Sequence, residues 1–184
     1  MAVSARRGTP LTIEEIRAAG LRLIVAGGVE ALSMRKLAAE LDVNPMSLYH
    51  HVANKTELIR GICVGTVGPL LDLPPDDGAP WQDQLRALAY AYRKLARTLP
   101  SLWTYVHNHP EVIELKEGGL WDVLFRILSA AGVPEDRREP TADVLHGFVS
   151  GLVLAETIGH IGGAQADEAY ETAIAMIIRG LPEH

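Results

Sequence analysis

The chain has 184 residues, of which 48% are hydrophobic and 22% charged, and this composition excludes a disordered chain and allows one or two small domains with a proper core. Its longest apolar runs are short and broken by Gly or charged residues, so we expect no membrane partner. The first ten residues lack the apolar stretch of a signal peptide, and the single cysteine, Cys63, has no internal disulfide partner, so we expect a cytoplasmic protein.

The formal net charge of −6 is unevenly distributed along the chain. Residues 1–60 hold eight Lys and Arg against six Asp and Glu, a net charge of +2, whereas the remainder holds nine against seventeen, a net charge of −8. A mildly basic first segment on an acidic body fits a DNA-binding part fused to a part with another task. Residues 1–10 form a polar arm, in which Arg6 and Arg7 either are disordered or reach phosphates or the minor groove.

The first two helices are predicted from their N-terminal caps. Thr12 and Glu15 have the spacing of a capping box, and Gly27-Gly28 ends the helix that this box begins. Ser33 caps the next helix, and Arg35 lies in its first turn. One face of that second helix is apolar, with the spacing i, i+3, i+4 and i+7 at Met34, Leu37, Ala38 and Leu41.

A tight turn and a third short helix follow. The link Asp42-Val43-Asn44 is too short for anything but a turn, Asn44 is a good N-cap, and Pro45 suits the first helical position, where no N–H is needed. Two short helices across a three-residue turn make a helix-turn-helix. In that motif the second helix enters the DNA major groove, and its N-terminal residues meet base edges.

The segment 33–58, SMRKLAAELDVNPMSLYHHVANKTEL, resembles the N-terminal domain of the tetracycline-repressor (TetR) family of transcriptional regulators. The resemblance covers residues 12–62 and rests on Arg35-Lys36-Leu37-Ala38, Val43, Ser47-Leu48-Tyr49, His51, Asn54-Lys55 and Leu58. Asp42 stands where many members carry Gly. Asp tolerates the left-handed conformation that such a turn needs, so the motif is preserved.

The third helix supplies most of the candidate DNA contacts. Val43 and Leu48 are needed for the core, so the outward-facing residues are Pro45, Met46, Ser47, Tyr49 and His50. Ser47 suits a base edge or phosphate and Met46 a thymine methyl, while Tyr49 and His51 have the reach of the DNA backbone. Lys55 lies at a helix N-terminus, which also binds phosphate. The family resemblance implies backbone contacts by Tyr49 and Lys55 and DNA-facing positions for Arg35, Ser47 and His51; the alternative is a solvated polar face.

The rest of the chain is predicted to be helical, with loops at its Pro- and Gly-rich stretches. Asn54 and Glu57 begin a helix that runs to about Val67, and residues 68–80 form a loop. Further helices are expected at about 81–98, 101–107, 110–131, 140–161 and 165–179, with an alternative break at Gly118-Gly119 and a charged loop at 135–139.

Aromatic and polar residues are interleaved along the body, as in small-molecule sites between helices. Glu156 and His160 stand four residues apart in an otherwise apolar segment, so they either pair with each other or await a polar ligand. His107 and His109 are two residues apart and so share no helix face, and Pro110 indicates a loop here, which argues against a metal site. The candidate ligand-binding residues are Trp103, His107, Trp121, Phe125, Glu156 and His160, with ordinary core packing as the alternative.

The helix expected at 140–161 has two apolar faces. Gly147, Gly151, Ala155 and Gly159 form a small-residue stripe, which allows another helix backbone to approach closely. The body covers one face, and a second subunit would cover the other. The resemblance implies that the last two long helices dimerise as a four-helix bundle, and the candidate interface residues are Leu145, Val149, Gly151, Leu152, Met176 and Ile177.

The sequence therefore predicts an all-α protein, with a three-helix helix-turn-helix domain at 1–62 and a helical effector-binding and dimerisation domain at 63–184. We expect a homodimeric transcriptional regulator, a repressor that leaves its operator DNA when a small molecule binds, with no cofactor, no metal and no enzymatic activity. One alternative is a DNA-binding dimer without effector, which a small, fully packed pocket would favour. The other is a helical enzyme, which would need a catalytic pair in a cleft.

Overall fold

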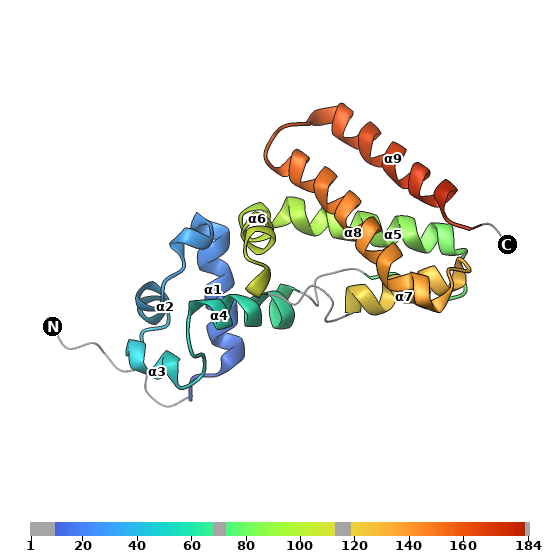
Figure 1. Ribbon diagram of the computed structural model, residues 1–184. Helices are drawn as coiled ribbons and strands as arrows, with labels where there is room; N and C mark the ends of the chain where they lie inside the picture. Colours follow the sequence, from blue (N-terminus) through green and yellow to red (C-terminus); the bar gives the residue numbers. More distant parts are fainter. Residues whose placement is uncertain (1–9, 68–72, 113–118, 183–184) are drawn as a thin grey trace. The chain divides into compact units, whose positions relative to one another are not determined.

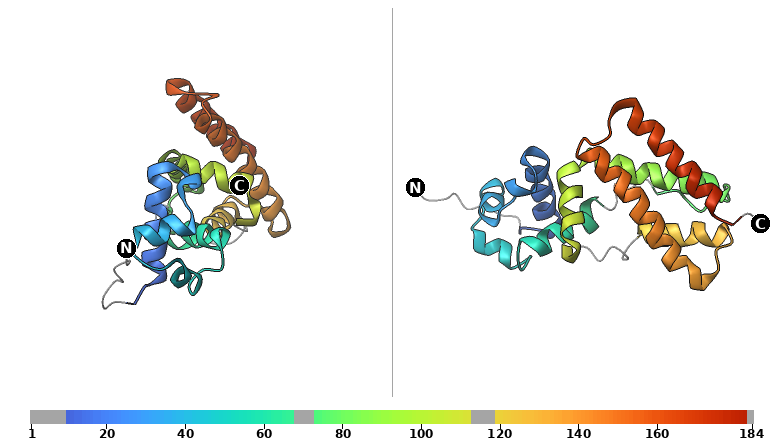
Figure 2. Two further views of the ribbon diagram at one scale, coloured as in Figure 1. Left: turned by 90° about the vertical axis from the view of Figure 1, so that its left-hand side faces the viewer. Right: turned by 45° about the horizontal axis from the view of Figure 1, so that its top comes forward.

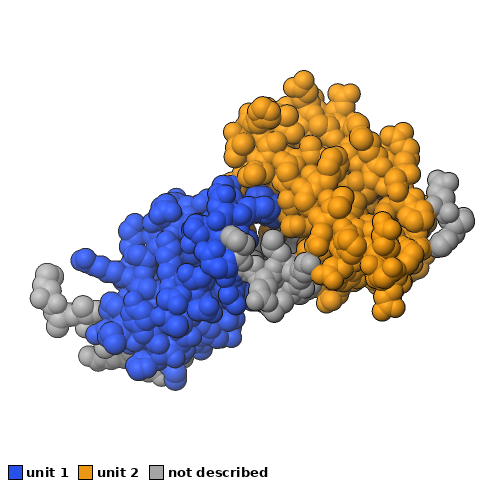
Figure 3. Space-filling view, in the orientation of Figure 1, with its two compact units in different colours: residues 1–70, 101–115 blue, residues 71–100, 116–184 orange. Residues whose placement is uncertain are grey.

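The computed structural model describes residues 10–67, 73–112 and 119–182 (Figure 1). Within these ranges every regular element is a helix, which confirms the all-α prediction. No helix among the described residues is both long and apolar enough to cross a membrane. The chain forms two compact units, and each is built from two segments of sequence: unit 1 is residues 1–70 and 101–115, and unit 2 is residues 71–100 and 116–184 (Figure 3).

Unit 1 holds the short helices of the first third of the chain and one later helix. Its elements are α1 (Ile13–Gly27), the 3-10 helix η1 (Val29–Ala31), α2 (Met34–Glu40), α3 (Pro45–Tyr49), α4 (Lys55–Ile62), the π-helix η2 (Cys63–Val67), α6 (Pro100–Asn108, from Ser101 onward) and η4 (Pro110–Val112).

The expected caps begin these helices. Thr12 and Glu15 form both hydrogen bonds of the capping box at the start of α1. The side chains of Ser33, Asn44 and Asn54 accept backbone N–H groups at the starts of α2, α3 and α4. Each cap satisfies an N–H group that the first helical turn leaves without a partner, which is why the sequence fixes these starts locally.

The core of unit 1 lies between α1, α2, α3 and α4. Gly20 on α1 allows the close approach of α4, because a Cβ atom there would lie 2.7 Å from Cδ1 of Ile62. The fully buried large side chains of this core are Ile16, Leu32, Leu37, Leu48, Leu58, Ile59 and Ile62.

Helix α6 packs on this first core, so the compact units differ from the boundary expected between residues 62 and 63. The Val29 N–H donates to Oγ of Ser101 over 3.0 Å, and the Arg60 guanidinium donates to the carbonyl of Glu111 over 2.8 Å. Leu102 and Val112 are buried in the same unit. A boundary placed at the end of α4 missed these contacts because they join residues far apart in sequence.

Unit 2 contains the four long helices α5 (Trp81–Thr98), α7 (Gly119–Ala130), α8 (Glu135–Thr157) and α9 (Gly163–Gly180). After a short turn, α9 runs back antiparallel to α8 (Figures 1 and 2). The buried core cluster of this unit comprises Leu85, Leu88, Trp121, Leu124, Ile127, Leu128, Ala131, Val133, Ala142, Leu145 and Leu181.

The expected boundaries of α8 were wrong at both ends. The helix begins at Glu135, five residues before Pro140, because Glu135 and Asp136 place negative charge in its first turn and stabilise its N-terminus. Pro140 lies inside the helix and removes one backbone donor. At the other end α8 stops at Thr157, and the chain then turns through Gly159 at φ 76°, which favours glycine.

Two further boundaries differ from the expectation. Helix α6 begins at Pro100, one residue before the start expected at residue 101. The helix expected over 110–131 is the short η4 followed by α7 from Gly119, and its part at 113–118, including Gly118, lies outside the described residues. The expected arm with Arg6 and Arg7 lies outside them as well.

Candidate functional site

The turn between α2 and α3 has the geometry of a helix-turn-helix. Asp42 has φ 51°, the left-handed conformation expected at this position. The Val43 N–H then donates to the Ala38 carbonyl over 3.0 Å, and the Asn44 side chain accepts the Met46 N–H over 2.9 Å. The departure from Gly at residue 42 therefore leaves the turn intact.

Helix α3 is anchored by one buried residue and presents the rest of its surface outward. Leu48 is fully buried, whereas 65% of Met46 and 47% of Tyr49 are exposed. Ser47 is half-buried. The other expected DNA-facing residues Arg35, Pro45, His50 and His51 are exposed. Helix α3 therefore presents a thioether and a phenol at the surface of unit 1.

Lys55 is half-buried, whereas Tyr49 and His51, the other residues expected to contact the DNA backbone, are exposed. It is the first residue of α4, and its Nζ donates to the Val29 carbonyl over 3.1 Å in a half-buried position. An ammonium has three donors, so this bond fixes the side chain without using its whole hydrogen-bonding capacity. Lys55 therefore also ties α4 to η1.

Unit 2 contains an interior cavity of about 50 Å³ between α5, α7, α8 and α9, and this cavity is partly open to the surface. The lining is apolar apart from one tyrosine and one histidine: Leu85, Leu88, Ala89, Tyr92, Leu120, Leu124, Leu145, His146, Val149, Ile174 and Ile177.

A polar cluster lies beside this cavity. The Tyr92 hydroxyl is 2.6 Å from Oγ of Ser150 and 2.9 Å from Nε2 of His146, which is itself 3.3 Å from Ser150. Burial raises the pKa of Tyr92, so its hydroxyl stays neutral. The Trp121 ring lies 5.4 Å from that of His146, and the buried Nε1 of Trp121 has no hydrogen-bond partner within residues 10–67, 73–112 and 119–182. Sequence reasoning missed Tyr92 and Ser150, although both lie on the buried faces of their helices.

The expected pairing of Glu156 with His160 was wrong. Glu156 instead forms a bidentate ion pair with Arg93, at 2.8 Å to Nε and 2.9 Å to a terminal nitrogen. His160 lies beyond the end of α8 and is exposed. The two residues therefore share no helix face.

Arg93 is the buried charge that sequence reasoning missed. It is 4% exposed, also donates to Asp167 over 2.8 Å, and lies over the Tyr170 ring at 4.6 Å. Its hydrogen bond with Glu156, followed by that with Asp167, raises the pKa of the guanidinium against the opposing effect of burial. The sequence feature that could have revealed this buried charge is the position of Arg93 on the buried face of α5, which also contains Leu85, Ala89 and Ala96.

The six expected ligand residues are divided between the two units. Trp103 and His107 belong to unit 1, where their rings lie 4.3 Å apart and Nδ1 of His107 is 3.1 Å from the Trp103 carbonyl. Trp121 and Phe125 belong to unit 2, with their ring centroids 6.0 Å apart. None of the six lines the interior cavity, although Trp121 adjoins it through His146.

The outer face of α8 and α9 is apolar, but two expected interface residues lie elsewhere. Leu145 is buried in the core of unit 2, and Ile177 packs against that core. In contrast, 44% of Phe148 and 56% of Met176 are exposed, and Gly151 has open space around it. Between these helices runs a groove of about 380 Å³, lined by Phe148, Leu152, Gln165, Glu168, Ala169, Thr172, Ala173 and Met176.

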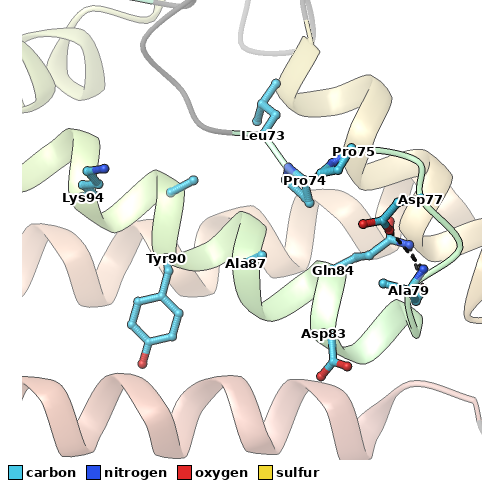
Figure 4. Close-up of a pocket in the computed structure, with 11 residues that line it drawn as sticks. Leu73, Pro74, Pro75, Asp77, Ala79, Asp83, Gln84, Ala87, Tyr90 and Lys94 are labelled. Carbon is cyan, nitrogen blue, oxygen red and sulfur yellow. Dashed lines mark hydrogen bonds between the residues drawn. The ribbon is translucent and has the colours of Figure 1, made fainter.

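A second surface groove of about 550 Å³ lies between residues 73–79 and α5 (Figure 4). Three of its polar residues bond within unit 2. Gln84 donates to the Ala79 carbonyl over 2.8 Å, and Asp77 accepts the Ala79 N–H over 3.0 Å. Tyr90 donates to Glu171 on α9. The described residues contain no cluster of three or more His, Cys, Asp or Glu that forms a metal site.

Two family models match the chain. The model described as "Bacterial regulatory proteins, tetR family" matches residues 16–62, and the "Tetracyclin repressor-like, C-terminal domain" matches residues 73–182. The HTH-type transcriptional repressor DrrR1 of Streptomyces coeruleorubidus is 30% identical over 79% of this chain and 54% of its own length. An HTH-type transcriptional regulator of Saccharopolyspora erythraea is 27% identical over 80% and 62%. The chain thus spans little more than half the length of these curated relatives.

Solved structures show the same fold. Apo ActR from Streptomyces coelicolor has a TM-score of 0.79 at 22% identity, over 94% of this chain and 95% of that one. ActR in complex with actinorhodin has a TM-score of 0.76, also at 22% identity, over 94% and 97%. At this level of identity the likeness concerns the fold alone.

Proposed function

The chain belongs to the tetR family of bacterial regulatory proteins, and from this we propose that it binds operator DNA as a homodimer, represses transcription, and is released by a small molecule. Unit 1 would bind the DNA, and unit 2 would dimerise and bind the effector. Family membership supports a regulator, and the alternative of a helical enzyme has no comparable support.

The observation that carries DNA binding is the exposure of Met46 and Tyr49 on a helix anchored by the fully buried Leu48. This arrangement presents α3 as a rigid element whose apolar and polar tips are available to a major groove. Ser47 and Met46 would read base edges, and Tyr49, His51 and Lys55 would contact the backbone. Arg35 and His50 would face the same DNA from α2 and from the end of α3.

The exposed apolar face of α8 and α9 supports the homodimer. Phe148 and Met176 are large and exposed, and Gly151 would admit the backbone of a facing helix, since no other atom fills its surroundings. Val149 and Leu152 are only partly covered within one chain. A second copy would bury this face, and Leu145 and Ile177 would support it from behind.

Effector control is supported by the interior cavity and by the ActR complex with actinorhodin, which shows a small molecule bound to a protein of this fold. The mechanism would be a population shift, in which the ligand prefers a dimer conformation whose recognition helices no longer match two half-sites. Repression is supported by the name of the relative DrrR1.

A second candidate is a DNA-binding dimer without effector. The cavity of about 50 Å³ favours it, because small-molecule sites usually measure about 300–1,000 Å³. The two candidates differ in whether the cavity can widen around a ligand.

Selection of bound fragments from genomic DNA with the purified full chain tests the proposal. A near-palindromic site bound by a dimer is the expected result, with half-sites roughly 34–36 Å apart or a multiple of that. Binding that is independent of sequence, or recovery of single half-sites by a monomer, would contradict it. Leu48→Ala is the matched negative control, because it removes the anchor of α3.

A further inference from the structure

We infer that the interior cavity of unit 2 accepts a neutral, mostly apolar molecule that carries one hydroxyl or carbonyl oxygen. This inference rests on the proposed effector role of the cavity and specifies its ligand chemistry. It follows from three features of the described residues: their lining of the cavity carries no Asp, Glu, Lys or Arg, the indole N–H of Trp121 has no partner among them, and Tyr92, His146 and Ser150 form a polar cluster.

The lining excludes a charged ligand. Among the described residues that line the cavity, none is Asp, Glu, Lys or Arg. The nearest buried cation along α5 is Arg93, and Glu156 and Asp167 already satisfy its guanidinium. An ionised group placed among leucines and isoleucines would lose its hydration without gaining a counter-ion. The ligand is therefore uncharged, and most of its surface is hydrocarbon.

The indole N–H of Trp121 needs a hydrogen-bond acceptor. Trp121 is 3% exposed, and its Nε1 has no hydrogen-bond partner among the residues that the structure describes. It stands on α7 beside Leu120 and three residues before Leu124, which both line the cavity, and its ring packs on that of His146. An indole N–H only donates, so neither a hydrocarbon nor an ammonium group satisfies it. A hydroxyl or carbonyl oxygen does.

The cluster on α5 and α8 complements the same oxygen. The Tyr92 hydroxyl, the Ser150 hydroxyl and Nε2 of His146 lie within 2.6–3.3 Å of one another. Hydroxyl groups both donate and accept, so this cluster exchanges hydrogen bonds with a ligand hydroxyl as well as with a carbonyl. Of these groups, Tyr92 and His146 line the cavity, Ser150 bonds to Tyr92, and the Trp121 ring contacts that of His146.

Ligand binding must widen the cavity. Its volume of about 50 Å³ is below the roughly 150 Å³ of a cavity that holds benzene. Leu124 fills part of the space from α7, so a bound molecule selects a conformation in which α7 has moved from α8 and α9. Such a movement of α7 would couple ligand binding in the cavity to the conformation of the rest of the protein.

Calorimetric titration of the full chain with benzene, phenol and benzoate tests this chemistry, because the three probes share one ring and differ in oxygen and charge. We use the wild type and Leu124→Ala, which enlarges the cavity. If Leu124→Ala does not fold, Leu120→Ala replaces it, because this variant enlarges the cavity at a less buried position. Phenol is expected to bind about tenfold more tightly than benzene, as one added hydrogen bond allows, and benzoate most weakly. Trp121→Phe should abolish the preference for phenol and keep benzene binding, whereas the control Trp81→Phe should change neither.

Equal affinity for benzene and phenol, tightest binding of benzoate, or no binding of any probe to the enlarged variants would overturn the inference. Operator binding is measured in parallel with each probe. If phenol is preferred and operator binding is unchanged at saturation, the effector role fails and the ligand chemistry stands. If benzoate binds best and releases the operator, the ligand chemistry fails and effector control stands.

Discussion

Arg93 and Glu156 form a bidentate ion pair inside unit 2, with nitrogen–oxygen distances of 2.8 and 2.9 Å. The side chain of Arg93 is 5% exposed and that of Glu156 15%, so both charges are largely removed from water. Asp167 on α9 completes the site, and the pair thereby joins α5, α8 and α9. The interaction makes Glu156 a structural residue of unit 2.

Removal of one partner should destabilise the protein strongly. Glu156→Gln leaves the buried guanidinium with only the more exposed Asp167, and we expect a loss of about 3 kcal/mol in the free energy of unfolding. Arg93→Met together with Glu156→Leu should recover much of this loss, because it removes both buried charges. Urea unfolding measures both values. Arg86→Met, which breaks the exposed pair with Glu171, is the control and should cost under about 1 kcal/mol.

Substitutions on α3 and at Lys55 should separate sequence reading from backbone binding. Met46→Ala and Ser47→Ala are expected to change the preferred base at one position, by about 1–3 kcal/mol of discrimination. Lys55→Ala should weaken binding to all sequences and reduce the salt slope by about 1. Fluorescence anisotropy over a salt series measures these effects.

Tyr49→Phe, which removes only the hydroxyl, is the matched variant for the proposed backbone contact. Because Lys55 also bonds the Val29 carbonyl, its variant needs a parallel unfolding measurement. Binding by Lys55→Ala and Tyr49→Ala equal to that of the parent would show that α3 does not dock as proposed.

Gly151→Leu should break the dimer without unfolding the chain. A Cβ atom at Gly151 meets no other atom within 4 Å, so the larger side chain fits within one chain but occupies the space of a facing helix. We expect a monomer by light scattering and a large loss of operator affinity. The control is Ala130→Leu at an exposed position on α7, which should stay dimeric. A parent protein that is monomeric at working concentration would refute the interface.

Alkaline pH should weaken the fold through the buried tyrosines. Burial raises the pKa of Tyr92 and Tyr170, so the unfolded chain releases these protons at a lower pH than the folded one. Their contribution to the free energy of unfolding is therefore complete below the ordinary tyrosine pKa of about 10 and is lost as the pH rises toward the folded pKa.

Urea unfolding from neutral to alkaline pH measures this loss. Tyr92→Phe should lower stability at neutral pH by about 1 kcal/mol, through its hydrogen bonds, and should make the alkaline decline shallower. Tyr49→Phe, at an exposed position, should leave the decline unchanged. An identical decline in the parent and in Tyr92→Phe would show that Tyr92 is not protonated more tightly in the folded state.

Local sequence determined the starts of α1, α2, α3 and α4 and the helix-turn-helix. Thr12, Ser33, Asn44 and Asn54 each cap a helix through bonds to residues two or three positions ahead, so the information lies within one turn of chain. Asp42 adopts the left-handed conformation on the same local grounds. The exposure of Met46 and Tyr49 followed from the periodicity that buries Leu48.

Only the tertiary structure decided which groups meet across the chain. Arg93 forms hydrogen bonds with Glu156, which is 63 residues further along the chain. The bond between Val29 and Ser101 spans 72 residues, and that between Tyr92 and Ser150 spans 58. Periodicity indicates that a residue lies on a buried face, but it does not indicate which helix covers that face, so Leu145 was assigned to a partner subunit although its own core buries it. The free energy of a buried charge or hydroxyl depends on its partner, and that partner is specified by the packing of whole helices.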